Sequence, residues 1–140
     1  MMLVEYKRNL FTAPEDWYFA HCISRDAAMG AGIAKEFVKQ FPELKQLRKG
    51  HQYNEHVGGC MLIDRVFNLI TKERYFDKPT YASLEQSLCS LKLLMQSNNV
   101  KRLAIPKIGC GLDRLEWNKV KAIIEEVFKD LDVKIVVCYL

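Results

Sequence analysis

The sequence predicts an α/β fold, in which a mixed and mostly parallel sheet carries helices on both faces. Short apolar segments with the periodicity of strands alternate along the chain with longer segments that have the periodicity of helices. Two strand-like segments follow each other directly in the middle of the chain, which indicates one hairpin. Glycine-rich turns precede two of the helices, and sheets of this kind bind ligands beyond the carboxyl ends of their strands.

The predicted strands cover residues 3–7, 17–23, 57–63, 65–71, 101–105 and 133–139. The first alternates apolar and polar residues, whereas 17–23 is almost continuously apolar, as expected for a strand covered on both faces. Its aromatic residues and His21 are therefore interpreted as core, in preference to a base-stacking platform or a catalytic base. Asp64 lies between the two adjacent strands and predicts a tight connection.

The first predicted helix runs from Ile33 to about Phe41, with Ile33, Phe37 and Phe41 on its apolar face. Pro42 breaks it, and Leu44 and Leu47 suggest a short second helix before a polar loop over residues 50–55.

The second half of the chain predicts two longer helices. Thr80 is a plausible N-cap for the first, whose apolar face runs from Tyr81 to Met95 and which ends at the asparagine pair 98–99. The second begins at Glu116, and its apolar face consists of Trp117, Val120, Ile124, Val127 and Phe128.

The chain has 140 residues, which is the size of one ordinary domain spanning 1–140. Its 49% hydrophobic content suffices for a core, and a net charge of +4 favours anionic ligands without indicating a DNA-binding tail. The five cysteines are scattered and odd in number, which is typical of reduced thiols in an intracellular protein and argues against a metal site. We find no secretory signal and no apolar run near the ~20 residues of a membrane span. We therefore expect a cytoplasmic monomer (or a nuclear one, in a eukaryote) that has no membrane partner.

Two glycine turns, 30–32 and 109–111, each precede a predicted helix. Neither has the third glycine of a dinucleotide-binding fingerprint or the Gly-Lys-Ser/Thr of a P-loop. Each could be an ordinary left-handed turn. Together they favour a nucleotide-type ligand, because backbone N–H groups at two helix starts could hold a diphosphate from both sides.

Lys72 and Asp113 are the candidate catalytic residues, and each has a simpler interpretation. Lys72 ends an apolar strand and begins a charged cluster, so it is either a solvated lysine or a partly buried amine that attacks a sugar carbon. Asp113 stands three residues before Glu116, which is the spacing of a capping box, and this spacing slightly favours a helix cap over an acid/base role. Ser24 lacks the G-x-S-x-G context of a serine hydrolase.

Several motifs carry a family resemblance: HCIS at 21–24, MGAGIA at 29–34, LITK at 69–72, KPTY at 78–81 and PKIGCGLDRL at 106–115. The chain resembles the macro domain family, and more narrowly its terminal ADP-ribose protein glycohydrolase branch, over nearly its whole length. The resemblance implies a three-layer α/β/α fold with a six-stranded mixed sheet and a cleft that binds ADP-ribose, with no cofactor and no metal.

The resemblance also implies a role for particular residues. Lys72 matches the lysine that attacks the anomeric carbon of ribose, and Asp113 matches the acid that assists release. Leu10 is expected at the adenine end, Ser24 at the distal ribose, and Leu140 against the ligand at the chain end. The full set of expected ligand contacts is Asn9, Leu10, Ser24, Met29, Gly30, Ala31, Gly32, Ile33, Ala34, Pro106, Lys107, Ile108, Gly109, Cys110, Gly111, Leu112 and Leu140.

One departure stands out. The family has an aspartate where this chain has Asn9, and that acid accepts a hydrogen bond from the adenine amino group. An asparagine oxygen can accept the same bond but lacks the charge, so adenine binding should be weaker unless Arg8 offsets it.

The resemblance predicts a hydrolase that removes ADP-ribose from acidic side chains through a covalent lysine intermediate. Alternatives are hydrolysis of O-acetyl-ADP-ribose, of ADP-ribose 1″-phosphate or of an ADP-ribosylated DNA base, or a reader that binds ADP-ribose without turnover. The expected partners are therefore ADP-ribose and ADP-ribosylated protein or nucleic acid.

Overall fold

The computed structural model describes residues 1–52 and 55–140. Its elements, in chain order, are β1 (Met2–Lys7), the 3₁₀ helix η1 (Leu10–Thr12), β2 (Tyr18–Ser24), α1 (Gly32–Gln40), the 3₁₀ helix η2 (Pro42–Gln52), β3 (Cys60–Ile63), β4 (Val66–Lys72), α2 (Tyr81–Ser97), β5 (Arg102–Ile105), α3 (Trp117–Phe128) and β6 (Lys134–Tyr139).

Within the described residues, the strands form one six-stranded sheet in the order β1-β6-β5-β2-β4-β3. All neighbours are parallel except β3 and β4, which pair antiparallel. The mixed, mostly parallel sheet is thereby confirmed. The hairpin at Asp64 is also confirmed: Ile63 pairs with Val66, and Asp64 takes the left-handed backbone (φ +54°) that a two-residue connection requires.

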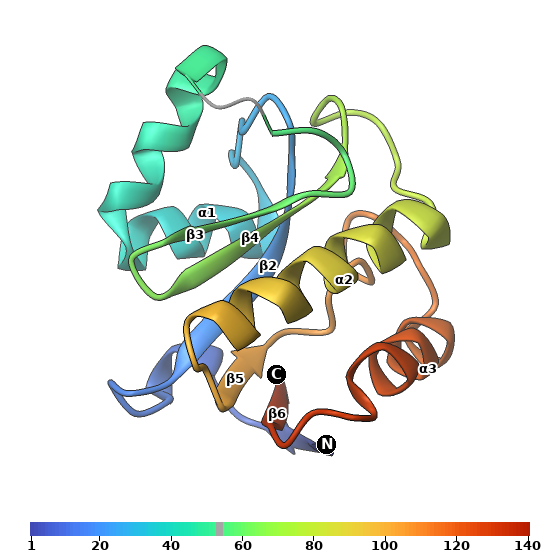
Figure 1. Ribbon diagram of the computed structural model, residues 1–140. Coiled ribbons are helices and arrows are strands. Elements are labelled where there is room, and N and C mark those ends of the chain that lie inside the picture. The colour runs from blue at the N-terminus through green and yellow to red at the C-terminus, as the bar shows by residue number, and fades with distance from the viewer. Residues whose placement is uncertain (53–54) are drawn as a thin grey trace.

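Two hydrophobic cores lie on opposite faces of the sheet, because successive side chains of a strand point to opposite sides. On β5, for example, Leu103 and Ile105 join the core under α2 and α3, whereas Ala104 joins the core under α1 and η2. Figure 1 shows the same layers, with α2 and α3 on one face of the sheet and α1 and η2 on the other. Both faces are therefore covered, as the near-continuous apolar strands predicted.

All the predicted helices are present, with one correction at the first helix and one at the loop after the second. Phe37 and Phe41 are buried as expected, but Ile33 is 41% exposed. Residues four apart share a helix face, yet burial also needs an opposing element, and Ile33 lies in the first turn beside the exposed loop at Gly30. The 3₁₀ helix η2 buries Leu44 and Leu47 and extends to residue 52, so a polar loop over 50–55 is wrong for its first three residues; positions 53–54 lie outside the described residues.

Residues 57–59 were expected to open the third strand, which instead begins at Cys60. Gly58 has a φ of +96°, a conformation outside the strand region, and this turn delays the regular pairing. Downstream, the cap at Thr80 is confirmed: its side chain accepts from the Ser83 N–H, and the Ser83 hydroxyl accepts from the Thr80 N–H.

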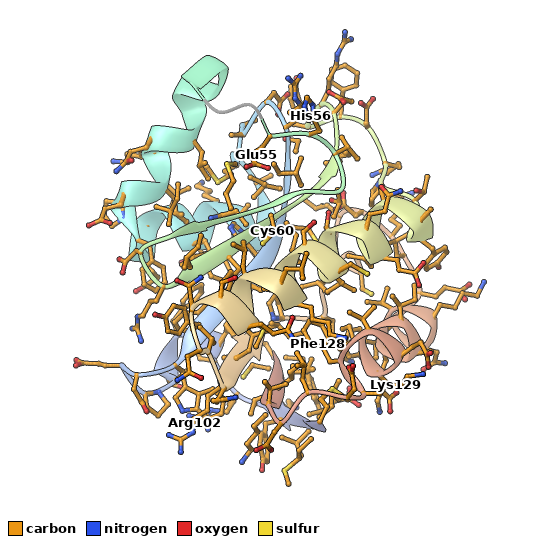
Figure 2. All side chains as sticks on the ribbon, in the orientation of Figure 1. Glu55, His56, Cys60, Arg102, Phe128 and Lys129 are labelled. Carbon is orange, nitrogen blue, oxygen red and sulfur yellow. The ribbon has the colours of Figure 1, made fainter. Side chains whose placement is uncertain are left out.

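The amino and carboxyl ends of the parallel strands lie on opposite sides of the molecule. Figure 2 places Phe128 in the interior between α3 and the sheet, and Arg102, at the start of β5, at the opposite end from Glu55 and His56. The Glu55 carbonyl accepts a hydrogen bond (2.9 Å) from Arg25, which directly follows β2. The loops beyond the carboxyl ends of the strands therefore gather away from Arg102. No helix in the described residues is long and apolar enough to cross a membrane.

Candidate active site

Lys72 is the last residue of β4, and an irregularity in the sheet positions it. Ile23 of β2 pairs with Ile70, but the next residue, Ser24, pairs with Lys72, so β4 carries one extra residue at this point. Such bulges redirect side chains and are common beside active sites. The carbonyl of the extra residue, Thr71, accepts a hydrogen bond (2.7 Å) from the Ser83 hydroxyl of α2, which stabilises the bulge from the neighbouring helix.

Asp113 meets Lys72 across 41 residues of sequence. The Lys72 Nζ donates to Asp113 Oδ1 at 2.6 Å, and the two side chains are only 13% and 14% exposed. The structure therefore corrects the slight preference for Asp113 as a helix cap. The N-cap of α3 is Glu116, whose own side chain makes no capping hydrogen bond among the described residues. An amine and a carboxylate in partly buried contact are suited to nucleophilic attack with proton transfer.

The two glycine turns lie side by side at the same end of the sheet. Gly32 has a φ of +60°, and a Cβ atom added there would come within 3.2 Å of Leu112 Cδ1 in the other turn. In the second turn Gly109 has a φ of +73°, and the Leu115 N–H donates to its carbonyl at 2.7 Å. Both left-handed positions favour glycine, and the contact with Leu112 makes the two turns one surface.

The first turn of α1 has backbone donors available for an anion. Ala31, its N-cap, makes no side-chain capping bond among the described residues, and residues 30–33 are exposed. The first four N–H groups of a helix have no partner within it, and the helix dipole favours negative charge there. By contrast, α2 is closed by its Thr80–Ser83 box. The open end of α1 is thus the better candidate for holding a phosphate.

Asp26, which no sequence motif indicated as a functional residue, ties the loop after β2 to the loop after β4. Its carboxylate accepts from the Ser24 hydroxyl, from the Ala28 N–H (3.3 Å) and from the Tyr75 N–H (3.0 Å). Burial opposes ionisation, but these donors outweigh it and hold the pKa of Asp26 below its usual value. The signal in the sequence was its place two residues after Ser24, at the end of a buried strand.

The backbone of this loop is constrained at two further points. Ala27 and Met29 both have positive φ, at +53° and +45°, although neither is glycine. Such conformations cost free energy and persist where the surrounding contacts hold them, often at functional sites. Both side chains are buried, at 2% and 5% exposed, which anchors the loop on the core under α1.

The predicted contact residues differ in how they reach the site. Leu10, Met29 and Ile108 are buried in the two cores. Ser24 is buried too, and it pairs with Lys72 in the sheet. Gly30, Ala31, Gly32, Ile33, Gly111 and Leu112 are exposed, and Ala34, Pro106, Lys107, Gly109 and Cys110 are half-buried.

Asn9 and Leu140 lie beyond β1 and β6, the two strands at the edge of the sheet farthest from Lys72. The Asn9 amide oxygen accepts from the Phe11 N–H (2.9 Å) and caps η1, while the Arg8 guanidinium donates to the Thr12 hydroxyl (3.1 Å). Leu140 is 92% exposed, so the structure brings it to this edge without packing it. The bond to Thr12 holds the Arg8 side chain against η1.

In sheet order, the predicted contacts follow β1, β6, β5, β2 and β4, from Asn9 at one end to Lys72 at the other. Neighbouring strands are ~4.8 Å apart, so these five strand ends span about 19 Å. An extended ligand with its anionic centre at the two glycine turns fits this arrangement.

Burial disfavours the thiolate form of the two cysteines near the site. Burial, and next the charge of Asp113, raise the pKa of Cys22 to about 12. Burial raises the pKa of Cys110 to about 11, against the opposing effect of Lys107. Because the thiolate is the nucleophilic form of cysteine, the Lys72 amine is the better candidate. No cluster of three metal-ligating side chains occurs in the part of the chain that the structure describes.

Comparisons with known proteins identify the class of protein to which this fold and site belong. The macrodomain of Thermus aquaticus DarG superimposes with a TM-score of 0.88 at 26% identity, over 99% of this chain and 98% of that one. The fold and the paired glycine turns therefore define a macro domain.

The human ADP-ribose glycohydrolase OARD1 is 45% identical over 132 residues, which are 94% of this chain and 87% of the relative. The DNA ADP-ribosyl glycohydrolase of Thermus aquaticus is 26% identical over 94% of this chain but 39% of its own length. No protein-family model matches. The chain belongs to the macro domain family, in the terminal ADP-ribose glycohydrolase branch.

Proposed function

We propose that this protein is an ADP-ribosyl glycohydrolase that releases ADP-ribose from acidic side chains. The observation that carries the proposal is the 2.6 Å contact between Lys72 Nζ and Asp113 Oδ1 at the end of the row of glycine turns. A pocket that only binds ADP-ribose has no need of this pair. Membership of the branch that includes human OARD1, which is named ADP-ribose glycohydrolase, supports the same reaction.

The diphosphate lies on the N–H groups at the start of α1 and on the turn around Gly109, where left-handed glycines bring the backbone close to the ligand. This placement directs the distal ribose toward Lys72. The exposed first turn of α1 leaves room for the ligand, and Leu112 lies across Gly32.

The reaction uses the amine as nucleophile and the carboxylate as proton carrier. Asp113 takes a proton from Lys72, and Nζ bonds to the anomeric carbon while the bond from that carbon to the acceptor oxygen breaks. The acceptor carboxylate leaves with the bonding electrons. The sugar opens to a Schiff base on Lys72, and water then releases ADP-ribose and restores the amine.

The test is the release of free ADP-ribose from a peptide ADP-ribosylated on glutamate. Lys72→Ala should abolish turnover and keep ADP-ribose affinity within a fewfold of wild type, because the diphosphate contacts come from backbone. Borohydride should trap a lysine adduct in the wild type and none in the variant. Unchanged release by Lys72→Ala would rule the mechanism out.

Lys92→Ala is the matched control. Lys92 also forms an ion pair with an aspartate, Asp130, at 2.8 Å, but on the α2–α3 side of the molecule. Its replacement should leave both turnover and binding at wild-type values.

The acceptor itself is open to a second candidate, an ADP-ribosylated DNA base. A relative over 94% of this chain is named DNA ADP-ribosyl glycohydrolase, which favours this candidate among the alternatives. Comparing release rates from the glutamate peptide, an ADP-ribosylated oligonucleotide, O-acetyl-ADP-ribose and ADP-ribose 1″-phosphate ranks the substrates. Binding of ADP-ribose without turnover on all four would make the protein a reader. We also propose that it acts as a cytoplasmic monomer; gel filtration and cell fractionation test this.

A further inference from the structure

The loop that enters α2 contacts the residue directly before Asp113. Lys78 Nζ donates to the Leu112 carbonyl at 2.7 Å, across 34 residues of sequence. Lys78 is exposed, but Pro79, which follows it, is buried and anchors this part of the loop on the molecule. A hydrogen bond from a charged donor is shorter and stronger than one between neutral groups. Lys78 therefore fixes the backbone on one side of Asp113.

The first residue of α2 contacts the backbone on the other side of Asp113. The Tyr81 hydroxyl accepts a hydrogen bond (3.0 Å) from the N–H of Glu116, the N-cap of α3. The ammonium of Lys119, in the first turn of α3, lies 5.6 Å from the centre of the Tyr81 ring. Figure 1 shows the segment that enters α3 passing beside the start of α2. Tyr81 therefore fixes the chain three residues after Asp113.

Between these two contacts the backbone takes a conformation that needs support. Arg114 has a φ of +62°, in the left-handed region that residues other than glycine rarely adopt. Inside the turn, the Arg114 N–H donates to the Gly111 carbonyl (3.1 Å) and the Leu115 N–H to the Gly109 carbonyl (2.7 Å). Such a conformation costs free energy and persists where the surrounding contacts hold it. The position of Asp113, next to Arg114, therefore depends on contacts from outside the turn as well as inside it.

The same stretch of chain also supports the other member of the catalytic pair. Ser83, in the first turn of α2, donates to the carbonyl of Thr71, the bulged residue directly before Lys72 (2.7 Å). The start of α2 and the loop that enters it thus hold the backbone beside both Lys72 and Asp113. This arrangement gives a physical reason for the 2.6 Å contact between two side chains that lie on separate segments.

We propose that Lys78 and Tyr81 are positioning residues for Asp113, and that together they keep its carboxylate against the Lys72 amine. This inference rests on the proposed function, in which Asp113 carries the proton. A displacement of a catalytic group by about 1 Å can cost on the order of a hundredfold in rate. Losing either contact should therefore lower turnover. Binding of ADP-ribose depends on the backbone of the glycine turns and should change little.

The first experiment measures kcat for release of ADP-ribose from the glutamate peptide and, by calorimetry, the Kd for free ADP-ribose. Lys78→Met removes the donor at similar side-chain length; it should lower kcat at least about tenfold and keep Kd within about threefold of wild type. Lys78→Arg keeps a charged donor and should hold kcat within about threefold of wild type. Lys129→Met is the matched control, because Lys129 also makes a 2.7 Å bond, to Glu126, but at the end of α3. It should change neither quantity.

The second experiment removes only the hydroxyl of Tyr81. Tyr81→Phe keeps the ring and should lower kcat at least about threefold at unchanged Kd, because the Glu116 N–H loses its acceptor. Tyr18→Phe is the control: it removes a hydroxyl from a half-buried tyrosine at the start of β2, and kcat should stay at the wild-type value. A merely structural role for Tyr81 would lower the free energy of unfolding and leave kcat of the folded enzyme unchanged.

Wild-type kcat in Lys78→Met or in Tyr81→Phe would overturn the inference. A loss of ADP-ribose affinity as large as the loss of kcat would also overturn it, because the two side chains would then shape the second glycine turn and not the position of Asp113. If the wild type releases no ADP-ribose from any substrate, the proposed function fails, and crystal structures of the wild type and Lys78→Met decide the inference. Displacement of Asp113 from Lys72 in the variant would support it, and an unchanged contact would overturn it.

Discussion

Asp113 is the residue at which two roles compete for one carboxylate. The spacing to Glu116 would allow it to cap α3, but its side chain turns to Lys72 instead, and the N-cap Glu116 makes no capping bond with its own side chain in the described structure. Asp113 and Lys72 are 41 residues apart in the sequence, so only the folded chain can bring the carboxylate to the amine. At this scale the chemistry depends on a single contact of 2.6 Å.

Asn9 is the residue at which the family resemblance predicts an aspartate. It caps η1 through its amide oxygen, a role that an aspartate fills equally well, so the fold tolerates the change. Because hydrogen bonds to charged groups are stronger by about 1 kcal/mol, Asn9→Asp should bind ADP-ribose about fivefold more tightly in calorimetry.

The matched control for that prediction is Asn98→Asp, which adds the same charge at the opposite end of α2 from the cleft. It should not change the affinity. Equal or weaker binding by Asn9→Asp would mean that this position does not meet the adenine amino group.

At the scale of elements, α2 supports the active site through its serines. Ser83 donates to the Thr71 carbonyl (2.7 Å), Ser87 to the Ile70 carbonyl (2.8 Å) and Ser90 to the Gly58 carbonyl (2.8 Å). The first two bonds lie at the bulge that precedes Lys72, where regular pairing between strands is interrupted. The helix thus supplies donors that the irregular sheet lacks.

Ser83→Ala should therefore affect catalysis as well as folding. Losing the bond to the Thr71 carbonyl, together with the capping bond from the Thr80 N–H, should cost about 2 kcal/mol of unfolding free energy. It should lower kcat about threefold or more, because Lys72 loses its fixed position. Ser90→Ala loses a similar bond, to Gly58 and not to the bulged residue, and should change stability alone. Denaturant titration and ADP-ribose release measure the two effects; equal kcat in both variants would contradict this role for α2.

At the scale of the whole molecule, a buried polar pair joins the middle of the sheet to the helix layer. His21 is fully buried, stacks on Phe37 of α1, and its Nε2 lies 2.7 Å from Asn68 Oδ1. Because the Asn68 amide donates to the Met61 and Val66 carbonyls, its oxygen is the acceptor and His21 Nε2 carries the proton. His21 Nδ1 has no hydrogen-bond partner among the described residues.

This pair makes stability depend on pH. Burial lowers the pKa of His21 from 6.5 to about 4, against the opposing bond to Asn68. The unfolded chain then binds more protons between these values, so the stabilisation is complete above pH 6.5 and is lost as the pH falls toward 4. The loss should be about 3 kcal/mol of unfolding free energy.

His21→Gln keeps a donor for Asn68 but does not titrate. Its free energy of unfolding is expected to fall less steeply than that of the wild type between pH 6.5 and 4, as measured by denaturant titration at each pH. Parallel profiles for the two proteins would show that another group controls acid unfolding.

Local patterns along the chain were enough to predict the class of fold and most of its elements. Alternating apolar residues predicted the strands, and because both faces of the sheet are covered, the pattern was strong along most of the chain. The caps and turns at Thr80 and Asp64 were also local signals, since each depends on neighbours a few residues away. The motifs at 29–34, 69–72 and 106–115 located the candidate site through family resemblance.

Features that depend on partners distant in sequence could not be predicted and emerge from the folded chain. The pairing of Lys72 with Asp113, the bulge at Thr71 and the fastening of the 73–78 loop by Asp26 all join segments more than ten residues apart. The exposure of Ile33 likewise could not be predicted from its spacing to Phe37 and Phe41. Spacing states which side chains share a face, whereas burial and ion pairing depend on what the folded chain places opposite that face.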